Sequence, residues 1–157
     1  MKTYDRQKAV SYARKWALNP NPNFYHFGGI GGDCTNFISQ CLLAGGCQMN
    51  FDKNNGWYYN SSYDRSPSWT SVKFLQEFLF NKNQRGPKAT PVSLNELEIG
   101  DIIQLRQNKT HFNHTVFVTK ILASDILVCA HSNDALDRPL KSYNFFQLLP
   151  LHIIQTY

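Results

Sequence analysis

The feature that most constrains this chain is the stretch from Gly31 to Gly46, which reads GGDCTNFISQCLLAGG. Its apolar residues recur at the i, i+3, i+4, i+7 and i+8 spacing of a helix that buries one face. They are Cys34, Phe37, Ile38, Cys41 and Leu42. Asp33 is a preferred N-cap residue, and the final glycines suit a helix end because glycine accepts the left-handed conformation. The pattern predicts a buried helix that starts at Asp33 and stops before Gly45.

Cys34 falls in the first turn of this predicted helix, so its sulfur should lie at the helix mouth. The partial positive charge of a helix N-terminus favours a nucleophilic thiolate. The glycines at 31 and 32 would let a substrate backbone approach closely. A cysteine on an apolar stripe is also often a small core residue, which is our interpretation of Cys41. For Cys34 both interpretations stay open until a base is found.

Composition indicates a globular protein with one domain, residues 1–157. The net charge of +5 comes from lysines and arginines that are scattered along the chain. Nucleic-acid binding would require clustered charge and a recognition motif, so we expect no nucleic-acid partner. A general attraction to polyanions, including anionic cell-wall polymers, is compatible with the charge. Four cysteines form neither a dense disulfide framework nor a CxxC metal pattern.

No signal peptide or membrane span precedes Tyr4. We therefore expect no membrane partner. The chain is expected to be cytoplasmic, exported without a cleaved leader, or a piece excised from a longer protein. We expect it to be a monomer.

The rest of the chain divides into a helical part and a strand-rich part. Amphipathic helices are predicted at about 5–18 and 70–82. The polar and aromatic segment between them includes Trp57, a candidate for the wall of a substrate groove. Residues 83–91 look like a turn-rich connector, and short strands are predicted at 102–105, 115–122, 125–130 and 151–154. The prediction is an α+β fold with N-terminal helices packed on a C-terminal antiparallel sheet.

The best candidate base is His114, which opens the predicted strand at 114–119. It shares a face with Val116 and Val118, because side chains alternate along a strand. If that face packs on the cysteine helix, the imidazole points towards the Cys34 sulfur. His131 ends the next strand, and a hairpin would make it a cross-strand neighbour of His114. This is the nucleophile, base and orienting residue of a triad.

The other histidines have simpler interpretations. His26 lies in the loop before the cysteine helix, and His152 lies in an apolar strand near the C-terminus. We expect both to be structural.

Residues 33–46, DCTNFISQCLLAGG, resemble the signature of the putative amidase domain family, which is grouped with the NlpC/P60 and CHAP peptidoglycan hydrolases among the papain-like folds. The segments LEIGDII at 97–103, NHTVFVT at 113–119 and HSND at 131–134 resemble its first sheet strand, its histidine strand and its third-residue segment. The resemblance runs in order from Tyr4 to Ile154. It implies an NlpC/P60-like, papain-like fold.

The resemblance also implies a cysteine hydrolase without cofactor or metal. Cys34 would attack an amide carbonyl, His114 would serve as base, and a thioester would form. The third residue is His131 (first choice) or Asn133. Candidate substrate contacts are Asp33, Thr35 and Trp57; Asp33 would meet a substrate amine, as in the NlpC/P60 hydrolases. The implied substrate is the peptide stem of the bacterial cell wall.

Two other classes of function stay open. In a zinc hydrolase, His111 and His114 would join Cys34 or His131 as ligands. The i, i+3 spacing of these two histidines suits a helix better than a strand. In a non-catalytic wall- or protein-binding module, the aromatic segment 57–69 would be the contact surface. Within the enzyme class, wall remodelling, phage lysis and an antibacterial effector toxin share this chemistry. The expected absence of a leader favours the last two, with action at the bacterial wall.

Overall fold

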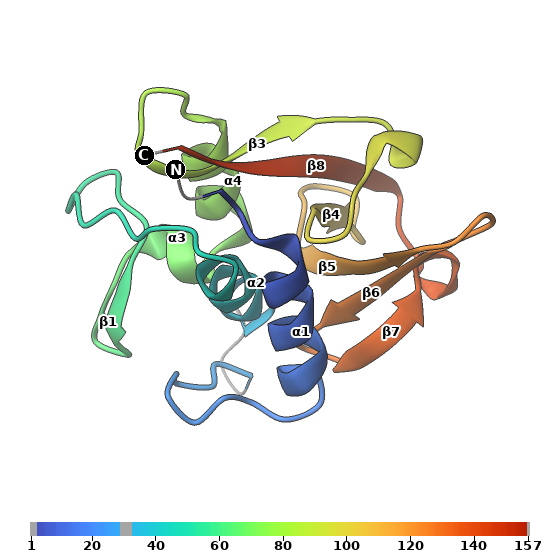
Figure 1. The fold of residues 1–157 in the computed structure, drawn as a ribbon, viewed down its shortest axis with the longest axis horizontal. Helices are drawn as coiled ribbons and strands as arrows, with labels where there is room; N and C mark the ends of the chain where they lie inside the picture. The colour runs from blue at the N-terminus through green and yellow to red at the C-terminus, as the bar shows by residue number, and fades with distance from the viewer. Residues whose placement is uncertain (1–2, 29–32, 157) are drawn as a thin grey trace.

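The computed structural model describes residues 3–28 and 33–156, and within them the helices precede the main sheet (Figure 1). The helices are α1 (Arg6–Trp16), α2 (Asp33–Ala44), α3 (Pro67–Thr70) and α4 (Val72–Phe80). A small hairpin of β1 (Tyr59–Ser61) and β2 (Asp64–Arg65) lies between α2 and α3. The remaining strands form one six-stranded sheet. The α+β prediction is confirmed.

The six-stranded sheet is antiparallel throughout, with the order β3-β8-β4-β5-β6-β7. Its strands are β3 (Gly86–Pro91), β4 (Ile102–Arg106), β5 (His114–Ile121), β6 (Ile126–Ala130), β7 (Ala135–Pro139) and β8 (Gln147–Thr156). Single 3₁₀ turns, η1 (Leu94–Glu96) and η2 (Leu140–Ser142), lie in the connections. The last strand, β8, therefore lies inside the sheet between β3 and β4.

Helix α2 ends as its glycines predict. Gly46 has a φ of +94°, and its N–H donates to the carbonyl of Leu43 while the N–H of Cys47 donates to that of Leu42. These two bonds form a Schellman motif, which satisfies the last carbonyls of a helix. The motif fixes where the helix stops, ten residues after Cys34.

The two predicted amphipathic helices are also present, each with a side-chain cap. Asp5 accepts from the N–H of Lys8 at the start of α1, and Ser71 accepts from that of Phe74 at the start of α4. Such caps satisfy backbone donors that have no partner inside the helix. Their buried residues face the core, as the apolar spacing predicts.

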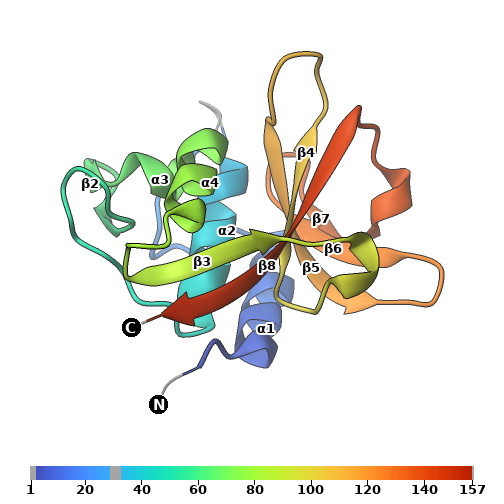
Figure 2. The ribbon, with the colours of Figure 1, turned by 90° about the horizontal axis from the view of Figure 1, so that it is seen from above.

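The two faces of the sheet carry different cores. The face that includes Phe117 and Cys129 packs on the helices in a cluster with Phe37. The opposite face, with Val116 and Val118, packs on a cluster drawn from the sheet and its connections. Figure 2 shows α1, α2 and α4 gathered on one side of the molecule and β6 and β7 on the other.

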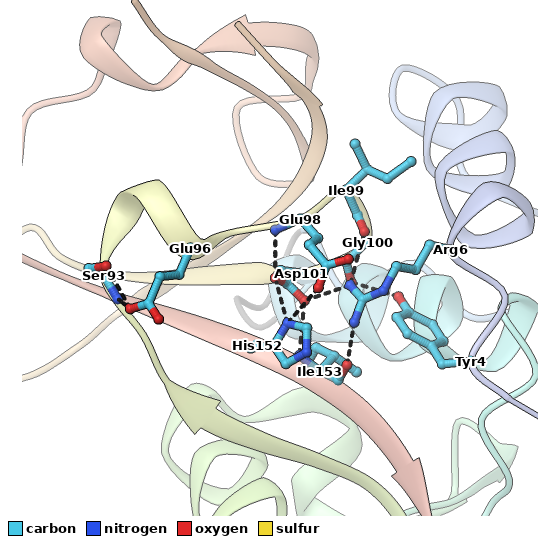
Figure 3. Close-up of polar contacts among 10 residues, drawn as sticks. All are labelled: Tyr4, Arg6, Ser93, Glu96, Glu98, Ile99, Gly100, Asp101, His152 and Ile153. Carbon is cyan, nitrogen blue, oxygen red and sulfur yellow. Dashed lines mark hydrogen bonds and ion pairs between the residues drawn. The ribbon is translucent and has the colours of Figure 1, made fainter. Parts of the chain in front are cut away.

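A partly buried ion pair joins α1 to the sheet (Figure 3). The Arg6 guanidinium donates to Asp101 Oδ1 over 2.7 Å and to the carbonyls of Ile99 and Ile153. Asp101 is fully buried and also accepts from the N–H groups of Glu98 and Ile153. These bonds fasten the first helix to the start of β4 and to the last strand.

The strand predictions missed β1, β2, β3 and β7. Residues 83–91 were expected to be a connector, but β3 occupies most of them, pairing with β8 from Gly86 to Pro91. Strand β7 was not predicted, because its residues alternate weakly in hydrophobicity. No helix in the described part of the chain is long and apolar enough to cross a membrane.

Candidate active site

Cys34 lies in the first turn of α2, as predicted, with 5% of its surface exposed. Its sulfur is 3.7 Å from the Thr35 hydroxyl. The backbone N–H of Thr115 is also within hydrogen-bonding reach of the sulfur. Because Thr115 follows His114 directly, this contact brings the helix mouth against the start of β5. The predicted close approach of glycines 31 and 32 lies outside the described residues.

Cys34 and His114 line one cavity of about 440 Å³, called here the Cys34 cavity. Its other lining residues are Gln107, Asn113, Ser132, Asn133, Arg138, Tyr143 and Asn144. A volume of this size is typical of small-ligand sites. Of the four cysteines, which are all buried thiols, Cys34 is the one that borders this cavity.

The neighbours of Cys34 and His114 favour the uncharged form of both. Burial raises the pKa of the Cys34 thiol, and the nearby Asp33 carboxylate adds to this; hydrogen bonds from Thr35 and Thr115 offset only part of it. Burial also lowers the pKa of His114 to about 4, with repulsion from Arg138 as a second cause. At neutral pH the cavity is therefore lined by an uncharged thiol and by a neutral imidazole that is able to accept a proton.

The face of β5 that packs on the helices is not the one predicted. The face that carries Val116 and Val118 was expected to pack on the cysteine helix, but it packs away from the helices. The imidazole of His114 lies 6.2 Å from the Tyr143 ring, centroid to centroid, on that far side. His114 borders the cavity as the first residue of β5, directly before Thr115, whose N–H contacts the Cys34 sulfur.

His131 occupies a different environment, between α1, α2 and the sheet. Its Nδ1 lies 2.6 Å from Asp33 Oδ2, its Nε2 lies 2.7 Å from the Trp16 carbonyl, and its ring stacks on Phe37. A carboxylate and a carbonyl can only accept hydrogen bonds, so both ring nitrogens must donate. His131 is therefore an imidazolium. Burial opposes this charge, yet the bonds to Asp33 and Trp16 raise the pKa of His131 overall.

This arrangement removes His131 as the residue that orients His114, our first choice. Both of its ring nitrogens are already bonded to other residues, so neither is available to His114. The alternative, Asn133, does line the Cys34 cavity. It lies with Ser132 in the turn between β6 and β7, where φ values of 58° and 63° match a tight hairpin turn. Among the described residues, no hydrogen bond joins Asn133 to His114.

Burial argues against the prediction that Asp33, Thr35 and Trp57 contact the substrate. Trp57 is 0% exposed, because its indole packs on Trp69 and donates to the Ser39 hydroxyl. Thr35 is likewise fully buried beneath Cys34. None of the three residues lines the cavity.

Asp33 serves the fold instead of meeting a substrate amine. Its Oδ1 accepts from the Phe27 N–H and the Asn36 amide, and its Oδ2 accepts from His131. Burial acts to raise the pKa of Asp33, but these bonds lower it overall. The carboxylate thus ties the preceding loop and β6 to the start of α2. It does not accept from the backbone of its own first turn, as an N-cap would.

The other histidines lie outside the Cys34 cavity. His111 is exposed and bonds to the Thr110 hydroxyl, so it does not share the site that the zinc interpretation requires. His152 lies beside Asp101, at 3.1 Å, in the contact network of Figure 3. Neither His111 nor His152 lines the cavity that Cys34 borders.

One group in the described residues has potential metal ligands close together. These are His26, Asp33 and His131, whose ligand atoms lie within 4.8 Å of one another. An ion there would have to displace the bonds of His131 to Asp33 or Trp16, because a histidine ligand must offer an unprotonated nitrogen. The group shares only His131 with the predicted zinc set.

The sequence interpretation missed most of the cavity wall. Arg138, Tyr143 and Asn144 come from β7 and the segment after it, and Gln107 comes from the loop after β4. No spacing in the sequence relates these positions to Cys34. Recognition of β7 as a strand would have provided the only signal, since its pairing with β6 sets Arg138 opposite Val128.

Comparisons with known proteins give a family and two relatives. The family model described as "Putative amidase domain" matches residues 3–152. The chain is 41% identical over 120 residues to "Uncharacterized protein YhbB" of Bacillus subtilis (strain 168), covering 73% of this chain and 37% of that protein. It is 26% identical over 147 residues to "Uncharacterized protein YjcM" of the same organism, covering 88% of this chain and 33% of that protein.

The chain thus spans about a third of the length of these curated relatives. No solved structure matches it.

Proposed function

This chain belongs to the putative amidase domain family, and from that premise we propose that it is a cysteine-dependent amide hydrolase with Cys34 as nucleophile and His114 as general base. The single observation that carries the proposal is the shared cavity that both residues line. A neutral imidazole and an uncharged thiol on one cavity support proton transfer during attack. Such a transfer does not require an ion pair in the free enzyme.

In the proposed reaction, the Cys34 sulfur attacks the carbonyl carbon of the amide while its proton passes to His114. The oxyanion of the tetrahedral intermediate accepts from the Cys34 backbone N–H, one of the donors that a helix start leaves without an internal partner. The C–N bond then breaks, and His114 returns the proton to the leaving amine. Water attacks the thioester, releases the carboxylic acid and restores the thiol.

We further propose a papain-like fold and, as substrate, the peptide stem of the bacterial cell wall, where the protein would act. Both rest on the resemblance to the NlpC/P60 and CHAP hydrolases noted from residues 33–46. A nucleophile at the start of a helix that packs on an antiparallel sheet supports the fold assignment. Asn133 is the proposed third residue, since it borders the cavity and His131 does not.

The test is mass spectrometry of purified muropeptides after incubation with the protein and with Cys34→Ala. The protein should convert muropeptides into pairs of fragments that together carry one added water. Cys34→Ala should lose turnover by about 10³-fold or more, the scale of nucleophile removal in other hydrolases. His114→Gln should lose about 10²–10⁴-fold, the usual contribution of a general base.

Cys41→Ala is the matched control, because it removes a second buried thiol from the same helix, away from the cavity. It should keep turnover close to that of the protein. Equal digestion by Cys34→Ala and the unmodified protein would remove Cys34 as nucleophile. If the protein binds muropeptides but cleaves none, the non-catalytic binding module replaces the hydrolase.

A further inference from the structure

Arg138 is the one charged residue at neutral pH among the nine that line the Cys34 cavity. The others there are amides, hydroxyls, the neutral His114 and the Cys34 thiol. No carboxylate borders the cavity, and no ion pair to Arg138 exists among the described residues. The cavity that contains the proposed nucleophile therefore has an unneutralised positive charge.

The guanidinium of Arg138 is held in one orientation. It lies over the Tyr143 ring, with its central carbon 3.7 Å from the ring centroid. Its Nε donates to the Ser142 hydroxyl over 2.7 Å, and its Nη2 donates to the Ser142 carbonyl over 3.1 Å. A guanidinium fixed in this way loses little entropy when it binds a ligand.

We propose that Arg138 binds a carboxylate of the substrate close to the scissile amide, so that the enzyme selects acidic peptides. This inference rests on the proposed hydrolase activity and names the chemistry of its substrate. Arginine matches a carboxylate with paired, charge-assisted hydrogen bonds. The side-chain amides of Asn113 and Asn144, which also line the cavity, can complete the contacts without adding charge.

The position of Arg138 also links binding to catalysis. Its charge helps to keep the pKa of His114 low. A bound carboxylate would offset that charge and make His114 a better proton acceptor when substrate is present. The enzyme would gain basicity at His114 only with an acidic substrate in place.

The test compares the muropeptides as purified with the same muropeptides after their carboxyl groups are converted to carboxamides. The protein should prefer the free acids by about 10- to 100-fold in kcat/KM, the range expected for a hydrogen bond to a charged group. Arg138→Met keeps an apolar side chain over Tyr143 and should bring the ratio close to one. Arg138→Lys keeps the charge without the planar fork and should retain only part of the preference.

Arg106→Met is the matched control. Arg106 also lies over an aromatic ring, that of Phe146 at 5.5 Å, but does not line the cavity. The Arg106→Met variant should leave the preference for free acids unchanged. Because each variant is compared with itself on two substrates, a loss of stability cancels from the ratio.

Calorimetry with Cys34→Ala separates the two proposals, since binding needs no turnover. Cys34→Ala should bind the free acids more tightly than the carboxamides, and adding Arg138→Met to it should remove this difference. That result supports the inference even if no bond is cleaved. Cleavage that depends on Cys34 but treats both substrates alike, with equal binding, would overturn the inference and leave the hydrolase intact.

Discussion

At the scale of single residues, two buried histidines have different charge states because their surroundings differ. His131 gives both ring protons to acceptors, Asp33 and the Trp16 carbonyl, and so carries a charge although it is buried. His114 has no such acceptor among the described residues, and burial keeps it neutral. One histidine therefore holds the helix start in place, while the other is free to accept a proton.

These states predict two separate titrations by NMR. The His114 ring should titrate near pH 4. The His131 ring should titrate above its usual value of 6.5 and show both N–H protons at neutral pH. A midpoint for His131 below 6.5 would contradict its assignment as an imidazolium. Asp33→Asn is the informative variant, because it should lower the His131 midpoint and leave that of His114 in place.

The pKa of His114 is lowered and that of His131 is raised, so activity and stability should depend on pH in different ranges. The proposed reaction needs neutral His114, so we expect turnover to fall as the pH drops through about 4. The His131 pair contributes stability fully below pH 6.5, and this contribution is lost as the pH rises through the raised His131 value. Unfolding by urea at a series of pH values would measure the second effect, and a pH profile of kcat/KM the first.

At the scale of elements, α2 determines where the chemistry is possible. Its apolar face packs on the sheet, the Asp33 bonds fix its start, and the Schellman motif fixes its end. The Cys34 sulfur consequently meets the first residues of β5. A shift of the helix along its axis would separate Cys34 from His114 without altering either residue.

Gly46→Ala tests the helix end. The position has a φ of +94°, which a residue with a Cβ adopts at a cost of about 1 kcal/mol. The added Cβ would meet no atom closer than 3.9 Å, so the backbone conformation alone should be responsible. The melting temperature should fall by about 2–4 °C. An unchanged melting temperature would show that the Schellman motif adds little.

At the scale of the whole molecule, the first helix and the last strand meet at one buried carboxylate. Asp101 binds Arg6 of α1 and the backbone of Ile153 in β8, and it also anchors the turn before β4 (Figure 3). The chain ends of the domain are thereby joined, although they are far apart in sequence. None of the residues in this network lines the Cys34 cavity. We therefore expect the network to stabilise the fold without taking part in the reaction.

Asp101→Ala should therefore destabilise the fold without a direct effect on chemistry. It leaves the partly buried Arg6 without its partner, a change that costs about 3–5 kcal/mol in buried pairs. Urea unfolding should show this loss, while kcat/KM per folded molecule stays unchanged. The pair Arg14 and Asp137 provides a control: it is more exposed, so Arg14→Ala should cost less than about 1 kcal/mol.

Local sequence patterns determined the three amphipathic helices, the position of Cys34 in a first turn and most of the strands, because spacing, caps and terminal glycines act over a few residues. They also predicted the α+β class and placed His114 near Cys34, with which it shares a cavity. The tertiary structure alone decided that His131 binds Asp33, that Trp57 lies in the core and that Arg138 borders the cavity. Those relations join residues that are distant in the chain. They depend on sheet register and on which face meets the helices, and no short-range pattern carries that information.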